Sequence, residues 1–242
     1  MSLLWRLLTH RSRNQTDDLP DDLGTELEFD SSLPADEIVA EEEIVTAPIL
    51  HLTDADFAKA AKDLNVSEAT IRAVAEVEAA GRGFLPDGRP QILYEAHIFH
   101  RQTNGAHANA IDRNGVRLSS PSWDRTLYGR TGAWQHDRLG DAAKLNWDAA
   151  HRSASWGLFQ ILGTNHVAVG HPLIAGFVDA MNAGAGPHLD AFIAFIRTNR
   201  LDGHLRNRNW AAFARGYNGP GFAANQYDTK LAAAYAKWSR TT

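Results

Sequence analysis

Glutamates are scarce over most of this 242-residue chain, and two of them lie where a carboxyl group could do chemistry. After residue 50 the chain contains only Glu68, Glu76, Glu78 and Glu95. Glu68 suits the first turn of a predicted helix, where the helix dipole favours a negative charge. Glu76 lies on the opposite side of that helix from Val74 and Glu78. Glu68 and Glu76 therefore have ordinary structural explanations.

Glu78 falls in the last turn of the predicted helix, on the edge of its apolar face. The partial negative charge at a helix C-terminus disfavours a carboxylate and raises its pKa. A glutamate that stays protonated near neutral pH can act as a general acid. The pattern thus makes Glu78 a candidate catalytic acid, and a surface glutamate at a frayed helix end is the structural alternative.

Glu95 lies in the string ILYEAHIFH, which has the composition of a strand. Strand alternation would place Glu95 and His97 on one face, where Glu95 could oppose Glu78 as the second carboxylate of a glycosidase. The separation of the two carboxylates would then decide between an inverting and a retaining mechanism. A structural ion pair of Glu95 with Arg82 or Arg89 is the alternative.

Metal chemistry and nucleic-acid binding are less well supported. The chain has no cysteine, so a zinc site would have to use imidazoles, of which His97, His100 and His107 are the nearest set. On a strand the first two would point to opposite faces, and we expect no metal and no cofactor. Residues 65–68 resemble the turn of a helix-turn-helix, but Glu76 and Glu78 on the second helix would repel DNA phosphates, so we expect no nucleic-acid partner.

Local signals predict a mainly α fold (α+β) in which a helical bundle surrounds a cleft and one small β-hairpin or sheet. Thr53 and Ser67 are N-caps for two helices, and Gly81 is the expected stop of the second. A turn at 86–88 predicts a hairpin within 83–99, followed by a long loop from 101 to 138. Further helices are predicted at 141–150, 154–162, 173–183, 187–200, 208–217 and 225–238.

Charge divides the chain into two parts. Residues 1–50 contain three basic and twelve acidic side chains, a net charge of −9, whereas residues 51–242 carry a net charge of +4. We predict an acidic, disordered tail over 1–50 and one catalytic domain over 51–242. The basic body would attract anionic polymers. Arg6 interrupts the opening apolar run, so we expect no signal peptide and synthesis in the cytoplasm.

Four strings taken together resemble a known family. In chain order they are VAEVEAAGRGFLPDGRPQILYEAHIFHR, SASWGLFQILGTNH, WAAFARGYNGPG and NQYDTKLAAAYAKW. They resemble the N-acetylmuramidase family of phage endolysins and bacterial cell-wall-degrading effectors, within the lysozyme-like group. The resemblance covers residues 52–240, and the acidic tail lies outside it.

The resemblance implies a peptidoglycan hydrolase that cleaves the β-1,4 bond between N-acetylmuramic acid and N-acetylglucosamine. In that family Glu78 matches the proton donor, and Glu95 follows as base or stabilising carboxylate. The residues that match the family's substrate-binding motifs are Ser155, Gln160, Tyr217 and Asn218. His97, which lies beside Glu95, is a further expected substrate contact. The string around Ser155 matches a helix that flanks the acid. The aromatic rings that could stack on sugars are those of Trp123, Trp134, Trp156 and Tyr217.

The expected partner is the glycan strand of peptidoglycan, bound by a monomer that reaches the periplasm or cell wall through a holin or a secretion apparatus. Three alternatives stay open at this point. A lytic transglycosylase uses the same scaffold and a single acid. A wall-binding module would have lost catalysis, and a zinc-dependent endopeptidase would require the metal site discounted above.

Overall fold

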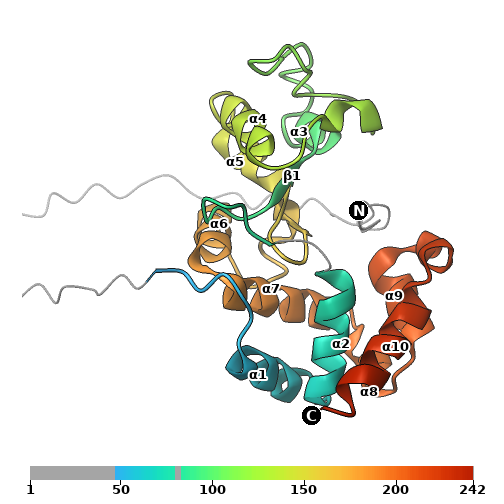
Figure 1. Ribbon diagram of the computed structural model, residues 1–242. Coiled ribbons are helices and arrows are strands. Elements are labelled where there is room, and N and C mark those ends of the chain that lie inside the picture. The colour runs from blue at the N-terminus through green and yellow to red at the C-terminus, as the bar shows by residue number, and fades with distance from the viewer. Residues whose placement is uncertain (1–46, 80–82, 242) are drawn as a thin grey trace, which may run out of the picture.

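The computed structural model describes residues 47–79 and 83–241, and the predicted mainly α fold with a small sheet is confirmed (Figure 1). Almost all of the predicted acidic tail lies outside these residues. Within them, Ile49 forms a β-bridge with Gly184, so the packed body begins slightly before residue 51. None of the described helices combines the length and apolar character that a membrane crossing requires.

The helices and strands follow one another along the chain as labelled in Figure 1. They are α1 (Asp54–Leu64), α2 (Glu68–Glu78), β1 (Ile92–Tyr94), α3 (Ala96–Gln102), η1 (Arg125–Tyr128), α4 (Ala133–Ala143), α5 (Trp147–Arg152), β2 (Ala154–Trp156), β3 (Ile161–Leu162), η2 (Gly163–Asn165), α6 (Ile174–Ala183), α7 (Ala185–Thr198), α8 (Asp202–Arg206), α9 (Trp210–Asn218), η3 (Pro220–Asn225) and α10 (Tyr227–Trp238).

Both N-cap predictions are confirmed. Thr53 and Asp56 form a capping box at the start of α1, and the Ser67 hydroxyl accepts a hydrogen bond from the Thr70 amide at the start of α2. Helix α2 packs between α1 and α10, and its apolar face lies in the core (Figure 1). It ends at Glu78 with Ala79 as the C-cap, while Gly81, the expected stop, lies outside the described residues.

The sheet differs from the predicted hairpin. The turn at 86–88 is present, but only one bridge, Phe84 to Pro90, closes it. Strand β1 pairs instead with β2, in the register Ile92 to Trp156, and β2 pairs with β3. Because β1 ends at Tyr94 and α3 begins at Ala96, the predicted strand alternation over residues 93–97 is wrong.

The helix predicted over 154–162 is also wrong, since this segment forms the β2–β3 hairpin. Gly157 and Gln160 have φ values of 69° and 49°, which a right-handed helix cannot contain. The helix predicted over 141–150 is divided into α4 and α5. The Asn146 side chain accepts the Ala149 amide and so starts α5 as a new helix.

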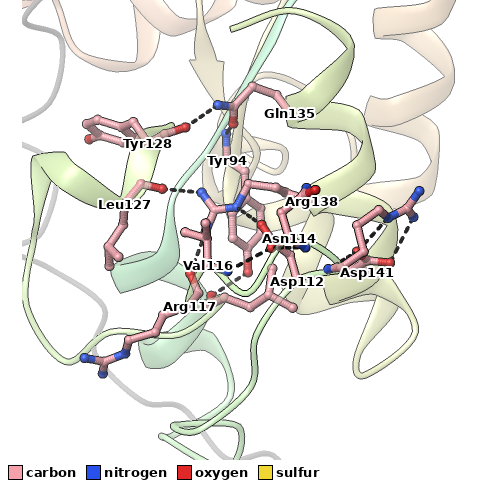
Figure 2. Close-up of polar contacts among 12 residues, drawn as sticks. Tyr94, Asp112, Asn114, Val116, Arg117, Leu127, Tyr128, Gln135, Arg138 and Asp141 are labelled. Atoms are coloured by element: carbon pink, nitrogen blue, oxygen red, sulfur yellow. Dashed lines mark hydrogen bonds and ion pairs between the residues drawn. The ribbon is translucent and has the colours of Figure 1, made fainter. Parts of the chain in front are cut away.

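The predicted long loop before α4 is largely confirmed, and α4 begins within its last residues. The buried Arg138 of α4 secures the loop by forming an ion pair with buried Asp112, at 3.0 Å between Nε and Oδ2 (Figure 2). The same guanidinium donates hydrogen bonds to the carbonyls of Leu127 and Arg117. One buried side chain therefore ties three points of the loop to a helix.

Gln135, one turn before Arg138, fixes the end of the same loop. Its amide nitrogen donates to the carbonyls of Tyr128 and Arg130, each at 2.7 Å, and its oxygen accepts the backbone N–H of Tyr94 in β1 at 3.0 Å (Figure 2). All the donor and acceptor atoms of this buried amide are thus used. The sheet, α4 and the loop that contains η1 form one rigid unit.

Candidate active site

Glu78 is the last residue of α2, and only 7% of its surface is exposed. Burial raises its pKa to about 7, while a hydrogen bond from Asn218 acts in the opposite direction. The raised pKa expected from the sequence is present, but burial is its main cause rather than the helix terminus. Near neutral pH this carboxyl group is held at the midpoint between its protonated and charged forms.

The two oxygens of Glu78 have different surroundings. Oε1 accepts a 2.9 Å hydrogen bond from Nδ2 of Asn218, the last residue of α9. Oε2 is buried without a hydrogen-bond partner among the described residues. Because Oε1 already accepts a hydrogen bond from the Asn218 amide, we place the proton of the neutral acid on Oε2.

Tyr217 precedes Asn218 and anchors α9 in the core. Its ring stacks against that of Phe213 with centroids 5.7 Å apart, and it meets the Phe192 ring edge-on at 5.1 Å. Its hydroxyl donates a 3.3 Å hydrogen bond to the Phe159 carbonyl in the β2–β3 turn. Burial and the nearby charge of Glu78 hold the pKa of Tyr217 well above its usual value. Tyr217 therefore lies beside the acid but is buried, and it offers no face for a sugar.

His188 of α7 was not singled out from the sequence, yet it holds the β2–β3 turn in place. Its Nδ1 accepts the Leu158 amide at 3.1 Å, so its Nε2 carries the proton that is donated to the Met181 carbonyl at 2.8 Å. A Cβ on Gly157 would lie 2.5 Å from the His188 ring. Glycine is therefore needed at this close approach, as well as for its positive φ. The string SWGLF indicated a glycine but not the histidine that covers it.

Two further candidates lie in the same hairpin. The Gln160 amide donates to the carbonyl of Gly157 at 2.9 Å and to that of Gln91 at 3.3 Å, and the residue is half-buried. Ser155 is buried in β2, paired with Leu93 of β1 and Leu162 of β3. The structure thus places Gln160 at an accessible turn and Ser155 within the sheet.

Glu95 does not have the surroundings expected of a catalytic base. It is the N-cap residue of α3, and its exposed fraction is 0%. Burial holds its pKa well above the ordinary value, and the Tyr128 hydroxyl and the Arg138 guanidinium only partly oppose that rise. A buried carboxyl whose pKa is raised is poorly suited to activate water or to stabilise a cation. The burial of Glu95 disfavours its predicted role as base or stabilising carboxylate, and that role stays a prediction.

His97 lies beside Glu95, with 3.7 Å between its Nδ1 and Glu95 Oε2. Burial and the charge of Arg101 lower the pKa of His97 to about 4, so the two side chains meet as neutral groups. The alternative ion pair of Glu95 with Arg89 is wrong, because Arg89 binds Asp87 at 2.6 Å. Arg82 lies outside the described residues.

The three histidines considered as zinc ligands have other roles. His97 and His100 lie on the helix α3 rather than on a strand, which corrects the geometry assumed for them. His100 contacts the Ser119 hydroxyl at 2.9 Å, and the His107 ring stacks on Phe99. Within 47–79 and 83–241, no three side chains of His, Asp or Glu are grouped to hold a metal ion.

The four aromatic residues expected to stack on sugars separate clearly by burial. Trp156 and Tyr217 belong to the core, so that expectation is wrong for both. The Trp134 ring lies against Gly129, where a Cβ would meet it at 2.2 Å, and beneath the Arg138 guanidinium. Trp123 is 51% exposed.

A helical fold around a small sheet, with a buried glutamate of raised pKa at a helix end, is typical of lysozyme-like glycosidases. Residues 67–239 match the family model described as N-acetylmuramidase, and the chain belongs to this family. It is therefore a glycoside hydrolase that acts on cell-wall peptidoglycan.

A solved structure supports the same assignment. The chain is 41% identical to the Burkholderia AP3 phage endolysin, with a TM-score of 0.71 over 79% of this chain and 72% of that one. No curated protein matches the chain.

Proposed function

We propose that this protein cleaves the β-1,4 bond between N-acetylmuramic acid and N-acetylglucosamine with Glu78 as the general acid. The observation that carries the proposal is the state of Glu78, a buried carboxyl whose pKa is raised to about 7 and whose Oε1 is held by Asn218. A proton donor of this pKa is half-protonated at neutral pH and readily gives up its proton.

In the proposed reaction Oε2 of Glu78 donates its proton to the glycosidic oxygen as the bond from that oxygen to the anomeric carbon breaks. The sugar becomes an oxocarbenium ion, and Glu78 becomes a carboxylate. The hydrogen bond from Asn218 favours the charged form, so it stabilises the Glu78 carboxylate that proton transfer leaves behind. Water then adds to the anomeric carbon, and its proton returns to Glu78.

The remaining candidates support the acid in different ways. Tyr217 and Asn218 are proposed to position Glu78, since both are buried and lie at the end of α9 beside it. Ser155 is proposed to hold the hairpin from within the sheet. His97 and Gln160 are partly exposed and are the proposed contacts to the sugar.

We propose the biological setting from the similarity to a protein named as a phage endolysin. Lysis of bacterial walls would require delivery through a holin or a secretion apparatus to the periplasm, and the enzyme would act there as a monomer. The net charge of +4 on residues 51–242 would favour association with anionic peptidoglycan.

A lytic transglycosylase is the second candidate function, and the burial of Glu95 is the observation that supports it. With Glu95 closed, Glu78 is the one carboxyl assigned a chemical role, and a transglycosylase needs a single acid. Such an enzyme closes a 1,6-anhydro ring without water. Mass spectrometry of the released muropeptides separates the two, because hydrolysis leaves a reducing end.

The acid is tested by Glu78→Gln on purified cell walls. We expect the turbidity decrease to fall by at least about a hundredfold, the low end of general acid catalysis, with an unchanged circular dichroism spectrum. Glu76→Gln is the matched control, since Glu76 lies on the same helix but binds Lys237 at the surface. Retained lysis by Glu78→Gln would overturn the proposal.

A further inference from the structure

Trp123 is a large aromatic side chain held in a fixed orientation at the surface. Although the residue is 51% exposed, its indole Nε1 donates a 2.7 Å hydrogen bond to the Tyr128 hydroxyl. The two rings meet edge-on, with centroids 6.3 Å apart and planes inclined by 68°. Tyr128 therefore holds the indole through its N–H and an edge-on contact, while about half of the residue stays open to solvent.

The support beneath this ring is rigid. Tyr128 ends η1, its carbonyl accepts the Gln135 amide, and its hydroxyl faces the buried Glu95 carboxyl (Figure 2 shows the backbone attachment). Asp124, the residue after Trp123, accepts the Thr126 amide at 2.8 Å and the Thr126 hydroxyl at 2.7 Å. The indole is therefore bonded to Tyr128, and the chain next to it is bonded through Asp124 to Thr126. Both contacts belong to the η1 segment, which Gln135 of α4 binds.

A fixed, exposed indole with polar neighbours suits the face of a sugar ring. A pyranose presents axial C–H groups on one face and hydroxyl groups at its rim, so an aromatic plane can cover the face while polar side chains meet the rim. The Tyr128 hydroxyl lies at the edge of the indole, and Asp124 is the next residue in the chain. Because the ring is already oriented, binding costs less side-chain entropy than it would with a freely rotating tryptophan.

Trp147 shows what distinguishes Trp123. Trp147 is also exposed, at 42%, but its ring stacks on His151 with centroids 3.9 Å apart. One of its faces is therefore covered by the His151 ring. Trp147 provides a matched control for any general effect of losing a surface indole.

We propose that Trp123 forms a subsite that stacks on one hexosamine ring of a glycan strand, with Tyr128 and Glu95 as the positioning residues beneath it. The inference rests on the proposed function for the identity of the polymer. It assigns Glu95 a place behind the binding surface instead of in the bond-breaking step. The subsite would increase the residence of a long strand on the enzyme.

The test measures binding and turnover separately, using peptide-free glycan strands prepared from purified walls. In the full chain carrying Glu78→Gln, co-sedimentation gives affinity without cleavage. We expect Trp123→Ala to raise the Kd about tenfold, Tyr128→Phe about threefold, and Trp147→Ala to leave it unchanged. With Glu78 intact, the first two should raise KM and leave kcat within about twofold.

The outcomes are decisive in both directions. Equal affinities for Trp123→Ala and the parent, or equal losses for Trp123→Ala and Trp147→Ala, would overturn the subsite. A fall in kcat with unchanged KM for Tyr128→Phe would overturn its positioning role. If walls are still lysed by Glu78→Gln while Trp123→Ala loses glycan binding, the proposed acid fails but the subsite stands. Thermal denaturation of each variant confirms folding.

Discussion

Asn218 donates a 2.9 Å hydrogen bond to Glu78 across a sequence separation of 140 residues. It joins the ends of two helices, α2 and α9, at the one carboxyl for which we propose a catalytic role. The amide can donate but cannot supply a charge, so it orients the carboxyl while allowing burial to keep its pKa near 7. Both the direction of the acid and its proton affinity depend on this contact.

Asn218→Ala should therefore move the alkaline limb of the pH–activity profile to higher pH. The lost hydrogen bond favours the carboxylate, so removing it raises the pKa of Glu78, by about one pH unit. Activity at pH 6 should fall as well, since the carboxyl loses its orientation. The profile is measured on purified walls, with Asn182→Ala as the control, because Asn182 is exposed and binds only within its own helix. A limb that stays in place would contradict the assigned contact.

Glu78→Gln should stabilise the fold at alkaline pH. The carboxyl has its ordinary pKa near 4.5 when unfolded and a pKa of about 7 when folded, so the folded state binds the extra proton between these values. Its cost to stability is absent below pH 4.5 and grows to about 3 kcal/mol above pH 7. Urea denaturation should show the variant gaining about 1 kcal/mol relative to the parent at pH 5 and about 3 kcal/mol at pH 8. Equal gains at both pH values would refute the burial argument.

Glu95→Gln should retain wall hydrolysis at pH 7 within about twofold, because the parent carboxyl is already neutral and an amide has nearly the same shape. A catalytic base would instead lose most of its activity on this change. The comparison is made by initial rates of turbidity decrease. A loss as large as that of Glu78→Gln would restore Glu95 to the chemical step.

Gly157→Ala should destabilise the protein by about 2–4 kcal/mol, since the added Cβ meets the His188 ring at 2.5 Å and the residue has positive φ. The measurement is urea denaturation at pH 7. Gly140 in α4 is the control, as a Cβ there meets nothing within 4 Å, and Gly140→Ala should stabilise the helix by about 0.5–1 kcal/mol. Similar changes in stability for Gly157→Ala and Gly140→Ala would show that the His188 ring moves to make room for the added methyl group.

Arg138→Ala should cost about 3–5 kcal/mol, because it leaves the buried Asp112 carboxylate without its partner and frees two loop carbonyls. Arg113→Ala removes a pair with Asp141 in which the arginine side chain is half exposed, and it should cost about 1 kcal/mol. Chemical denaturation compares the two variants. Equal costs would mean that the loop does not depend on Arg138.

The features predicted correctly from the sequence are those whose causes are local. Thr53 and Ser67 cap their helices through residues three positions away, and Glu78 lies in the last turn of its helix as the local pattern indicated. The features that the sequence did not indicate have distant causes. Ser155 is in a strand because β1 pairs with it from some sixty residues earlier, and Glu95 is closed by Tyr128 and Arg138 of a later loop and helix. No pattern within the string SASWGLFQIL or ILYEAHIFH contains those partners.

Helix α10 lies along α2 in Figure 1. Lys237 and Trp238, at the C-terminal end of α10, each donate a 2.8 Å hydrogen bond to Glu76 of α2. Asn218 reaches Glu78 from α9, just before α10. During synthesis the helix that bears the acid therefore emerges long before the parts that enclose it. A nascent chain that stops short of residue 218 lacks the amide that binds Glu78. The contact that orients the acid can therefore form only after most of the chain has been made.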